Sequence, residues 1–360
     1  MAKPPLTSIH WCGIILIFYT FISVISGSLY LEQALLFSIS DPRVHIWKNY
    51  CILPVLFIIT FSTVKDKETA IWILVTMCAT MVLMDYYTAQ QVMWYHSIES
   101  RVKIHGTFVY LGPNEVAAFY NQYSIIMLAV LFHMKKGWWR FGLAFLILIN
   151  LYIVVFMFSR AAYAATFIGM FCLFLFKKRF LLIPLILTAL CWHLVLPERV
   201  IERIEMTTGE YNELDSSSET RIVVWKDSLD LFSENPIFGV GFGVFRYSGF
   251  ALGDTHNIYL KILAEQGIIG MFIFLGLLMS FFTYGMRLYR NSDDDLIKGL
   301  GLGFSISIIV LMVNNIFGNR WTYLEVSAFL WVTAGVVARL YFIEMQSKSP
   351  KLNLHQQMNK

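Results

Sequence analysis

Long apolar stretches run along the chain and are separated by short polar segments. A helix that crosses a membrane needs about 20 mostly apolar residues, because that length spans about 30 Å of hydrocarbon. Ten stretches approach this pattern: residues 10–28, 46–63, 69–89, 115–133, 138–158, 161–176, 180–196, 267–285, 299–317 and 324–343. The pattern predicts an all-α polytopic membrane protein with about ten transmembrane helices. Residues 31–39 are apolar but too short to cross, which indicates a re-entrant or interfacial segment.

Composition agrees with a lipid-embedded chain. Of its 360 residues, 57% are hydrophobic and only 14% are charged, whereas a soluble domain is nearer half apolar and a quarter charged. The five cysteines all fall in apolar stretches, so neither a disulfide framework nor zinc-ligand spacing is present. The sequence also contains no nucleotide-binding signature. We therefore expect the lipid bilayer as a partner, and no metal, cofactor or nucleic acid.

Positive charges predict the orientation of the helices, because cytoplasmic segments are enriched in lysine and arginine. With the N-terminus inside, the short inner segments and the tail hold 15 lysines and arginines, and the short outer segments hold six. The alternation predicts that both termini are cytoplasmic. It divides the chain into four parts: seven spans in residues 1–196, a long outer loop in 197–256, three spans in 257–343, and a cytoplasmic tail in 344–360.

The long outer loop differs from the other connections in length and charge. It carries eleven acidic and five basic residues, and a polar segment of that length usually has a function. The pattern of apolar positions in residues 219–233 predicts an amphipathic helix, which should end before Asn235-Pro236. Its apolar residues recur at intervals of three and four: Ile222, Val223, Trp225, Leu229 and Phe232.

Four local patterns are candidates for chemistry, and each has a structural alternative. Asn114 follows Gly112-Pro113 and is either an N-cap or a site residue, with the cap favoured. Arg160 lies in a tight outer turn among small residues, and either binds a ligand or extends to lipid headgroups. Arg221 lies near the start of the loop helix, against the preference set by the helix dipole, and is either a functional residue or part of a solvated surface. A lone histidine is more often structural than catalytic, but His256 ends the long loop where the chain re-enters the membrane, and histidine can act as a general base near neutral pH.

A glycine-rich segment, Gly239-Val240-Gly241-Phe242-Gly243, lies upstream of His256. It is not a dinucleotide fingerprint, because no strand–helix unit surrounds it. We expect it to form a mobile loop at the rim of a site.

Taken in order, these patterns resemble the O-antigen ligase/polymerase superfamily of bacterial membrane glycosyltransferases. The resemblance covers roughly residues 105–285, and members often have around a dozen spans, so the count here extends up to twelve. The matching elements are Gly112-Pro113-Asn114, Ser159-Arg160, Arg221 with Trp225, Asn235-Pro236 with the glycine-rich segment, His256-Asn257 with Tyr259-Leu260, and Glu265-Gln266-Gly267.

The resemblance implies a reaction on the periplasmic side of the bacterial inner membrane. A glycan is moved, with inversion, from a polyprenyl diphosphate such as undecaprenyl diphosphate to an acceptor hydroxyl. His256 is then expected to act as the catalytic base, and Arg160, Arg221 and Arg320 to bind the diphosphate, because a guanidinium pairs well with phosphate oxygens. The expected supporting residues are Asn114, Asn257, Tyr259 and Glu265.

The resemblance allows two kinds of acceptor. The acceptor is lipid A-core in a ligase, which we favour, or a second lipid-linked glycan in an O-antigen or exopolysaccharide polymerase. A secondary transporter is a further alternative, since ten spans alone suit one. Transporters place ionisable residues at mid-membrane in paired halves, whereas the ionisable residues here fall near the ends of spans.

Overall fold

The computed structural model describes the chain except residues 1–4, 96, 109, 206–215, 248–252 and 359–360. In the described part, nine helices are long and apolar enough to cross a membrane. These are α1 (Ser8–Tyr30), α2 (Pro42–Thr63), α3 (Lys67–Trp94), α4 (Pro113–His133), α5 (Trp139–Phe156), α6 (Arg160–Lys177), α11 (Ile258–Asn291), α12 (Asp295–Ile316) and α13 (Leu324–Met358). The protein is therefore an all-α, multi-pass membrane protein, as predicted.

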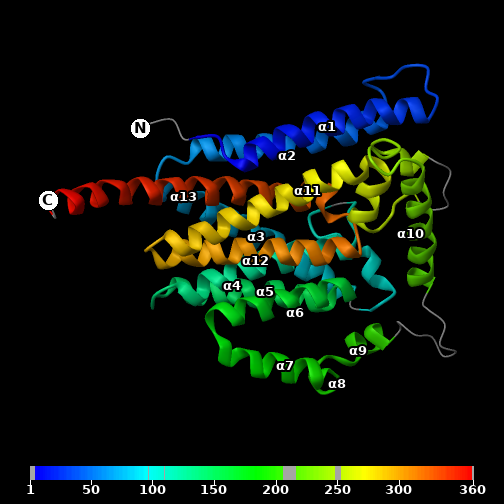
Figure 1. The fold of residues 1–360 in the computed structure, drawn as a ribbon. Helices are drawn as coiled ribbons and strands as arrows, with labels where there is room; N and C mark the ends of the chain where they lie inside the picture. The colour runs from blue at the N-terminus through cyan, green and yellow to red at the C-terminus, as the bar shows by residue number, and fades with distance from the viewer. Residues whose placement is uncertain (1–4, 96, 109, 206–215, 248–252, 359–360) are drawn as a thin grey trace.

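Shorter elements connect the long helices. They are η1 (Ser100–Lys103), η2 (Arg179–Leu181), α7 (Leu182–Leu190), α8 (Trp192–Val195), α9 (Glu198–Glu205), α10 (Ser216–Glu234), η3 (Val244–Tyr247) and η4 (Arg320–Thr322). Most of them lie at one end of the bundle, whereas η2 and α7 lead back to that end from the end of α6 (Figure 1). We call the end that carries α9 and α10 the loop end (Figure 1). The start of α1 and the end of α13 lie at the opposite end.

The seventh predicted span is the one that departs from expectation. Residues 180–196 form η2, α7 and α8, and the chain breaks at Cys191 between the two α-helices. Neither α7 nor α8 has a buried residue, so little tertiary packing supports one continuous helix there. The segment nevertheless returns the chain from the end of α6 to α9 at the loop end (Figure 1). It accounts for the difference between nine long helices and about ten predicted spans.

Helices α4 and α12 form the centre of the bundle. About three quarters of each spanning window is buried, 78% in α4 and 72% in α12, compared with 22% in α3. Glycines on α12 allow close packing, because a Cβ on Gly303 would lie 2.8 Å from Ile126 Cα of α4. Small residues serve this purpose in membrane helix pairs generally. The start of α4 and the end of α12 are thereby held together at the loop end.

The glycine-rich segment is buried rather than a mobile rim, so that expectation was wrong. Gly241 N donates to Glu265 O at 2.9 Å, and Phe242 N donates to Ser23 O of α1 at 2.9 Å. Gly241 has a φ of +126°, and a Cβ there would lie 2.1 Å from Gly27 Cα. The glycines are therefore needed because two helices approach the backbone closely.

Helix α11 begins earlier than the predicted span at residue 267. It starts at Ile258 and is interrupted at Gly267, whose φ is +64°. The segment Ile258–Gln266 packs under the glycine-rich segment, where Val240 N donates to Ala264 O at 2.9 Å. The start of α11, next to His256, is thus fixed by the long loop itself.

The helix predicted at 219–233 exists as α10, but its packed face differs from the predicted one. Val224, Ser228 and Leu231 are buried, whereas Ile222, Val223 and Leu229 are exposed. Val224 and Leu231 pack with Val244, Phe245 and Ala264. Residues 206–215 and 248–252 of the predicted loop lie outside the described part of the chain.

Candidate active site

Five arginines line one small cavity at the loop end of the bundle. The cavity is formed by residues from η1, the starts of α4 and α6, α9, α10, and the connection after α12: Arg101, Asn114, Phe158, Ser159, Arg160, Ala161, Arg203, Arg221, Phe317 and Arg320. The structure therefore brings together the three arginines predicted from the sequence and adds two. None of the described lining residues is acidic.

The turn between α5 and α6 is held by two of these arginines. Phe158 is fully buried and has a left-handed φ of +51°, a conformation that costs free energy in a residue other than glycine. Arg101 Nη1 donates to Met157 O at 3.0 Å and to Phe158 O at 2.8 Å, and Arg203 Nε donates to Phe158 O at 3.4 Å. These bonds stabilise the turn that places Arg160 at the first residue of α6.

Positively charged side chains are concentrated at the cavity. Burial, and then the nearby charges of Arg203 and Arg160, lower the pKa of Arg101 to about 10, so Arg101 is still protonated at neutral pH. The N-terminus of α6 faces the cavity through Ser159, Arg160 and Ala161, and a helix N-terminus adds partial positive charge. The arrangement suits an anion with several oxygen atoms, such as a diphosphate.

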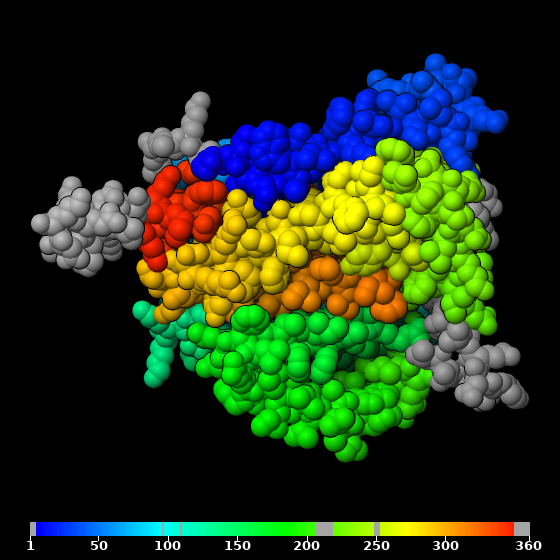
Figure 2. All heavy atoms as spheres, in the orientation of Figure 1, coloured from blue at the N-terminus to red at the C-terminus, as the bar shows by residue number. Residues whose placement is uncertain are grey.

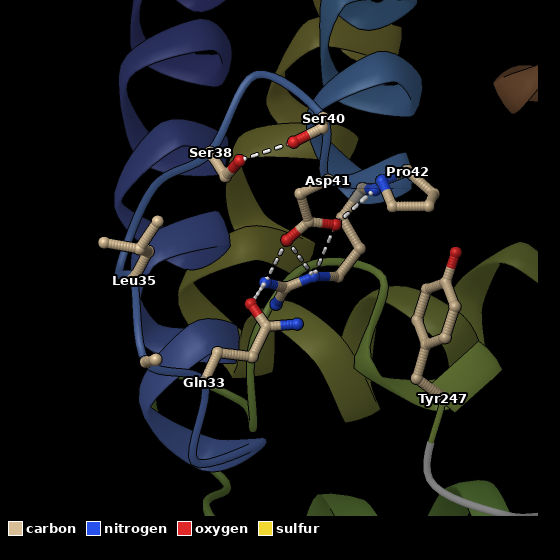
Figure 3. Close-up of a pocket in the computed structure, with 9 residues that line it drawn as sticks. Gln33, Leu35, Ser38, Ser40, Asp41, Pro42 and Tyr247 are labelled. Atoms are coloured by element: carbon tan, nitrogen blue, oxygen red, sulfur yellow. Dashed lines mark hydrogen bonds and ion pairs between the residues drawn. The ribbon is translucent and has the colours of Figure 1, made fainter.

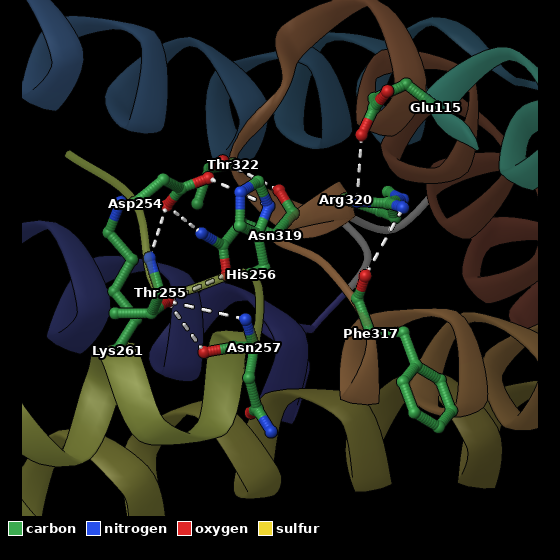
Figure 4. Close-up of polar contacts among 10 residues, drawn as sticks. All are labelled: Glu115, Asp254, Thr255, His256, Asn257, Lys261, Phe317, Asn319, Arg320 and Thr322. Atoms are coloured by element: carbon green, nitrogen blue, oxygen red, sulfur yellow. Dashed lines mark hydrogen bonds and ion pairs between the residues drawn. The ribbon is translucent and has the colours of Figure 1, made fainter. Parts of the chain in front are cut away.

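Arg320 is fixed by a carboxylate beside the cavity. It is 3% exposed, and its Nη1 lies 2.8 Å from Glu115 Oε1 (Figure 4). Glu115 follows Asn114 in the first turn of α4. Gly112 rather than Asn114 precedes the helix, so the N-cap alternative for Asn114 was wrong, and Asn114 lines the cavity instead.

His256 lies next to this cavity, in an unusual backbone conformation. Its φ is +49°, and such strained residues concentrate at functional sites. Its Nδ1 lies 3.9 Å from Asp254 Oδ2, and Asn319 Nδ2 donates to Asp254 (Figure 4). Asn319 immediately precedes Arg320. The hydrogen bond between Asn319 and Asp254 therefore connects His256 to the part of the site that carries Arg320.

Burial lowers the pKa of His256 below its ordinary value of 6.5. Asp254 opposes this shift, whereas the charges of Arg221 and Arg320 lower the pKa further. Two of the arginines that line the cavity are therefore close enough to His256 to influence its protonation. At neutral pH the imidazole is therefore mostly uncharged, which is the form that accepts a proton.

The other three predicted supporting residues have structural contacts and do not line the cavity. Asn257 caps α11, since its Oδ1 accepts hydrogen bonds from Tyr259 N at 2.9 Å and Leu260 N at 3.1 Å. Tyr259 Oη donates to Met312 O of α12 at 2.8 Å. Glu265 is 1% exposed beneath the glycine-rich segment.

Sequence reasoning did not select Arg101, Arg203, Glu115, Asp254 or Asn319 as site residues. Asp254 could have been selected from the sequence, because a carboxylate two residues before the candidate base is close enough to interact with it. Arg101 and Arg203 belong to no motif, and only the folded turn at Phe158 brings them together.

The central part of the chain matches a family model described as O-antigen ligase, over residues 143–275. The resemblance to the O-antigen ligase superfamily is thereby confirmed. No curated protein matches the chain. The O-antigen ligase match extends from α5 into α11, and it includes Arg160, Arg221 and His256. Asn114 and Arg320 lie outside it, and the fold places them at the same cavity.

Replacing Arg101 with methionine should destabilise the protein by about 1–3 kcal/mol, because the carbonyls of Met157 and Phe158 lose a charged donor. The measurement is thermal unfolding of the purified protein in detergent. Lys103→Met is the matched control, since Lys103 lies in the same 3₁₀ helix and is exposed. Equal stability of the two variants would contradict the role given to Arg101.

Proposed function

We propose that the protein is a glycosyltransferase of the bacterial inner membrane that uses a glycan carried on undecaprenyl diphosphate. The observation that supports this most directly is the cavity of five arginines beside an uncharged histidine. The match to the O-antigen ligase family model supports glycosyltransferase activity of the ligase or polymerase type. The finer proposal is an O-antigen ligase with lipid A-core as acceptor, acting on the periplasmic side, with both termini cytoplasmic.

In the proposed reaction the diphosphate is the leaving group. The acceptor oxygen forms a bond to the anomeric carbon of the donor as the bond from that carbon to the diphosphate oxygen breaks. The electron pair of the broken bond leaves with the diphosphate, whose developing charge is stabilised by Arg160, Arg221 and Arg320. His256 accepts the acceptor's proton. Attack opposite the leaving group inverts the anomeric configuration.

Asp254 has a positioning role in this mechanism. A carboxylate beside a histidine base orients the ring and stabilises the charge that the ring acquires. Asp254 is itself oriented by Asn319 and lies 3.7 Å from Lys261 Nζ. The base is thereby set in a defined direction before the acceptor binds.

The polymerase alternative shares the donor and differs only in the acceptor, which is then a second lipid-linked glycan. The description of the matching family names the ligase, and this is the reason for the preference. Transfer by the purified protein to lipid A-core, compared with transfer to a second lipid-linked glycan, distinguishes the two.

Replacing His256 with alanine should reduce the transfer rate by roughly 10²–10⁴-fold, the usual contribution of general base catalysis. The experiment measures transfer from the lipid-linked donor by purified variants. His193→Ala is the matched control, because His193 is also partly exposed and lies in α8, outside the residues that line the cavity. Transfer by His256→Ala at a rate close to that of the control would remove the catalytic role.

The pH dependence of transfer should reflect the protonation of the His256 imidazole. Because burial lowers its pKa, kcat/KM should fall only as the pH drops below 6.5. Asp254 raises the pKa of His256, so Asp254→Asn should move this acidic limb to still lower pH while reducing the rate. Asp230→Asn, on the exposed side of α10, should leave the limb in place. A limb that moves to higher pH in Asp254→Asn would contradict the assignment.

A further inference from the structure

A second cavity lies at the loop end, between the α1–α2 connection and η3 (Figure 3). Its volume of about 330 Å³ falls within the range of roughly 300–1,000 Å³ typical of small-molecule sites. It is lined by Gln33, Ala34, Leu35, Ser38, Ser40, Asp41, Pro42, Arg43 and Tyr247. It shares no lining residue with the arginine cavity.

The charged residues of this second cavity neutralise each other. Arg43 is fully buried, and its Nη2 lies 2.5 Å from Asp41 Oδ2. The same nitrogen donates to Gln33 Oε1 at 2.6 Å and to Ser28 Oγ at 2.7 Å. The buried arginine therefore holds Asp41 and Gln33 in fixed positions. Its charge is matched by Asp41, so the second cavity does not favour an anion.

The groups that remain for a ligand are polar, uncharged and aromatic. The amide nitrogen of Gln33 points across the cavity toward Tyr247 (Figure 3). The hydroxyls of Ser38 and Ser40 bond to each other at 2.8 Å, and hydroxyls both donate and accept. A sugar offers the complementary pair of features, since its hydroxyls bond to amides and hydroxyls and its C–H face packs on an aromatic ring.

The location of this cavity relates it to the acceptor. Tyr247 follows Arg246, and a Cβ on Gly253 would lie 3.4 Å from Arg246 Cγ. This side of the cavity is therefore close to Gly253, three residues before His256. The start of α11 lies between the α1–α2 connection and the start of α6 (Figure 1). In an inverting transfer the acceptor approaches opposite the diphosphate. The acceptor chain therefore extends away from the arginine cavity, and the second cavity shares no lining residue with that cavity.

We propose that this cavity binds a neutral sugar of the acceptor, and this inference rests on the proposed transferase function. Apolar side chains beside the cavity suit an acceptor that is anchored in the membrane. The α1–α2 connection stands out from the bundle at the loop end (Figure 2), and Leu35 and Ile39 on it are 66% and 77% exposed. Their exposed apolar surface is of the kind that contacts lipid, and it adjoins the cavity, since Leu35 also lines the cavity.

The test compares kinetic constants for donor and acceptor in Gln33→Ala and Tyr247→Ala. Each variant should raise the acceptor KM roughly tenfold, equivalent to about 1.4 kcal/mol, without changing the donor KM or the kcat at saturating acceptor. Tyr247→Phe, which keeps the ring, should lie near the wild type. Tyr152→Ala is the matched control, because Tyr152 is exposed to a similar degree, 43% against 42%, and lies on α5.

An unchanged acceptor KM in both alanine variants would overturn the proposal, and so would a rise in the donor KM alone. Both side chains are exposed, and thermal unfolding confirms that each variant is folded. Binding of the delipidated acceptor oligosaccharide without donor separates this inference from the proposed function. Weaker binding to Gln33→Ala than to the wild type supports the sugar site even if no transfer is seen. Equal binding, with transfer intact in the wild type, removes the sugar site alone.

Discussion

Like charges brought together in one cavity determine much of the architecture at the loop end. Five guanidinium groups face the same small space, and their mutual repulsion grows as water is excluded. The protein offsets this repulsion with oxygen atoms: the carbonyls of Met157 and Phe158 accept from Arg101, and the Glu115 carboxylate pairs with Arg320. A left-handed buried phenylalanine is stable there because two arginines hold its carbonyl. This arrangement of fixed guanidinium groups is suited to a polyanion.

The membrane bundle explains how residues distant in the sequence meet at this cavity. Close packing of α4 on the glycines of α12 fixes Asn114 and Glu115 beside Arg320. The tight α5–α6 turn adds Arg160, and the long loop adds Arg203 and Arg221. The glycine-rich segment, packed between α1 and α11, sets the start of α11 and thereby His256. Each element contributes one or two polar side chains to the cavity, and the rigid helices hold these side chains in fixed positions.

The sequence was sufficient for the helices and for the central motif residues, because long apolar stretches and His256, Arg160 and Arg221 are local features. It was insufficient where tertiary contacts decide. The break at Cys191 reflects missing packing rather than missing hydrophobicity. The packed face of α10 depends on α11 and η3, so Val224 replaced Ile222 in the interface. The backbone contacts of Arg101 and Arg203 at Phe158 depend on a turn conformation that no spacing rule indicates.

The central claim is that the arginine cavity binds the donor's diphosphate. The most direct measurement is the affinity of the purified protein for undecaprenyl diphosphate compared with undecaprenyl monophosphate, in the wild type and in Arg221→Ala, without acceptor. The account predicts tighter binding of the diphosphate by the wild type and a loss of roughly tenfold or more in the variant, since a charged hydrogen bond contributes about 1.5–3 kcal/mol. Equal affinity for the two lipids, or unchanged diphosphate binding in Arg221→Ala, would contradict it.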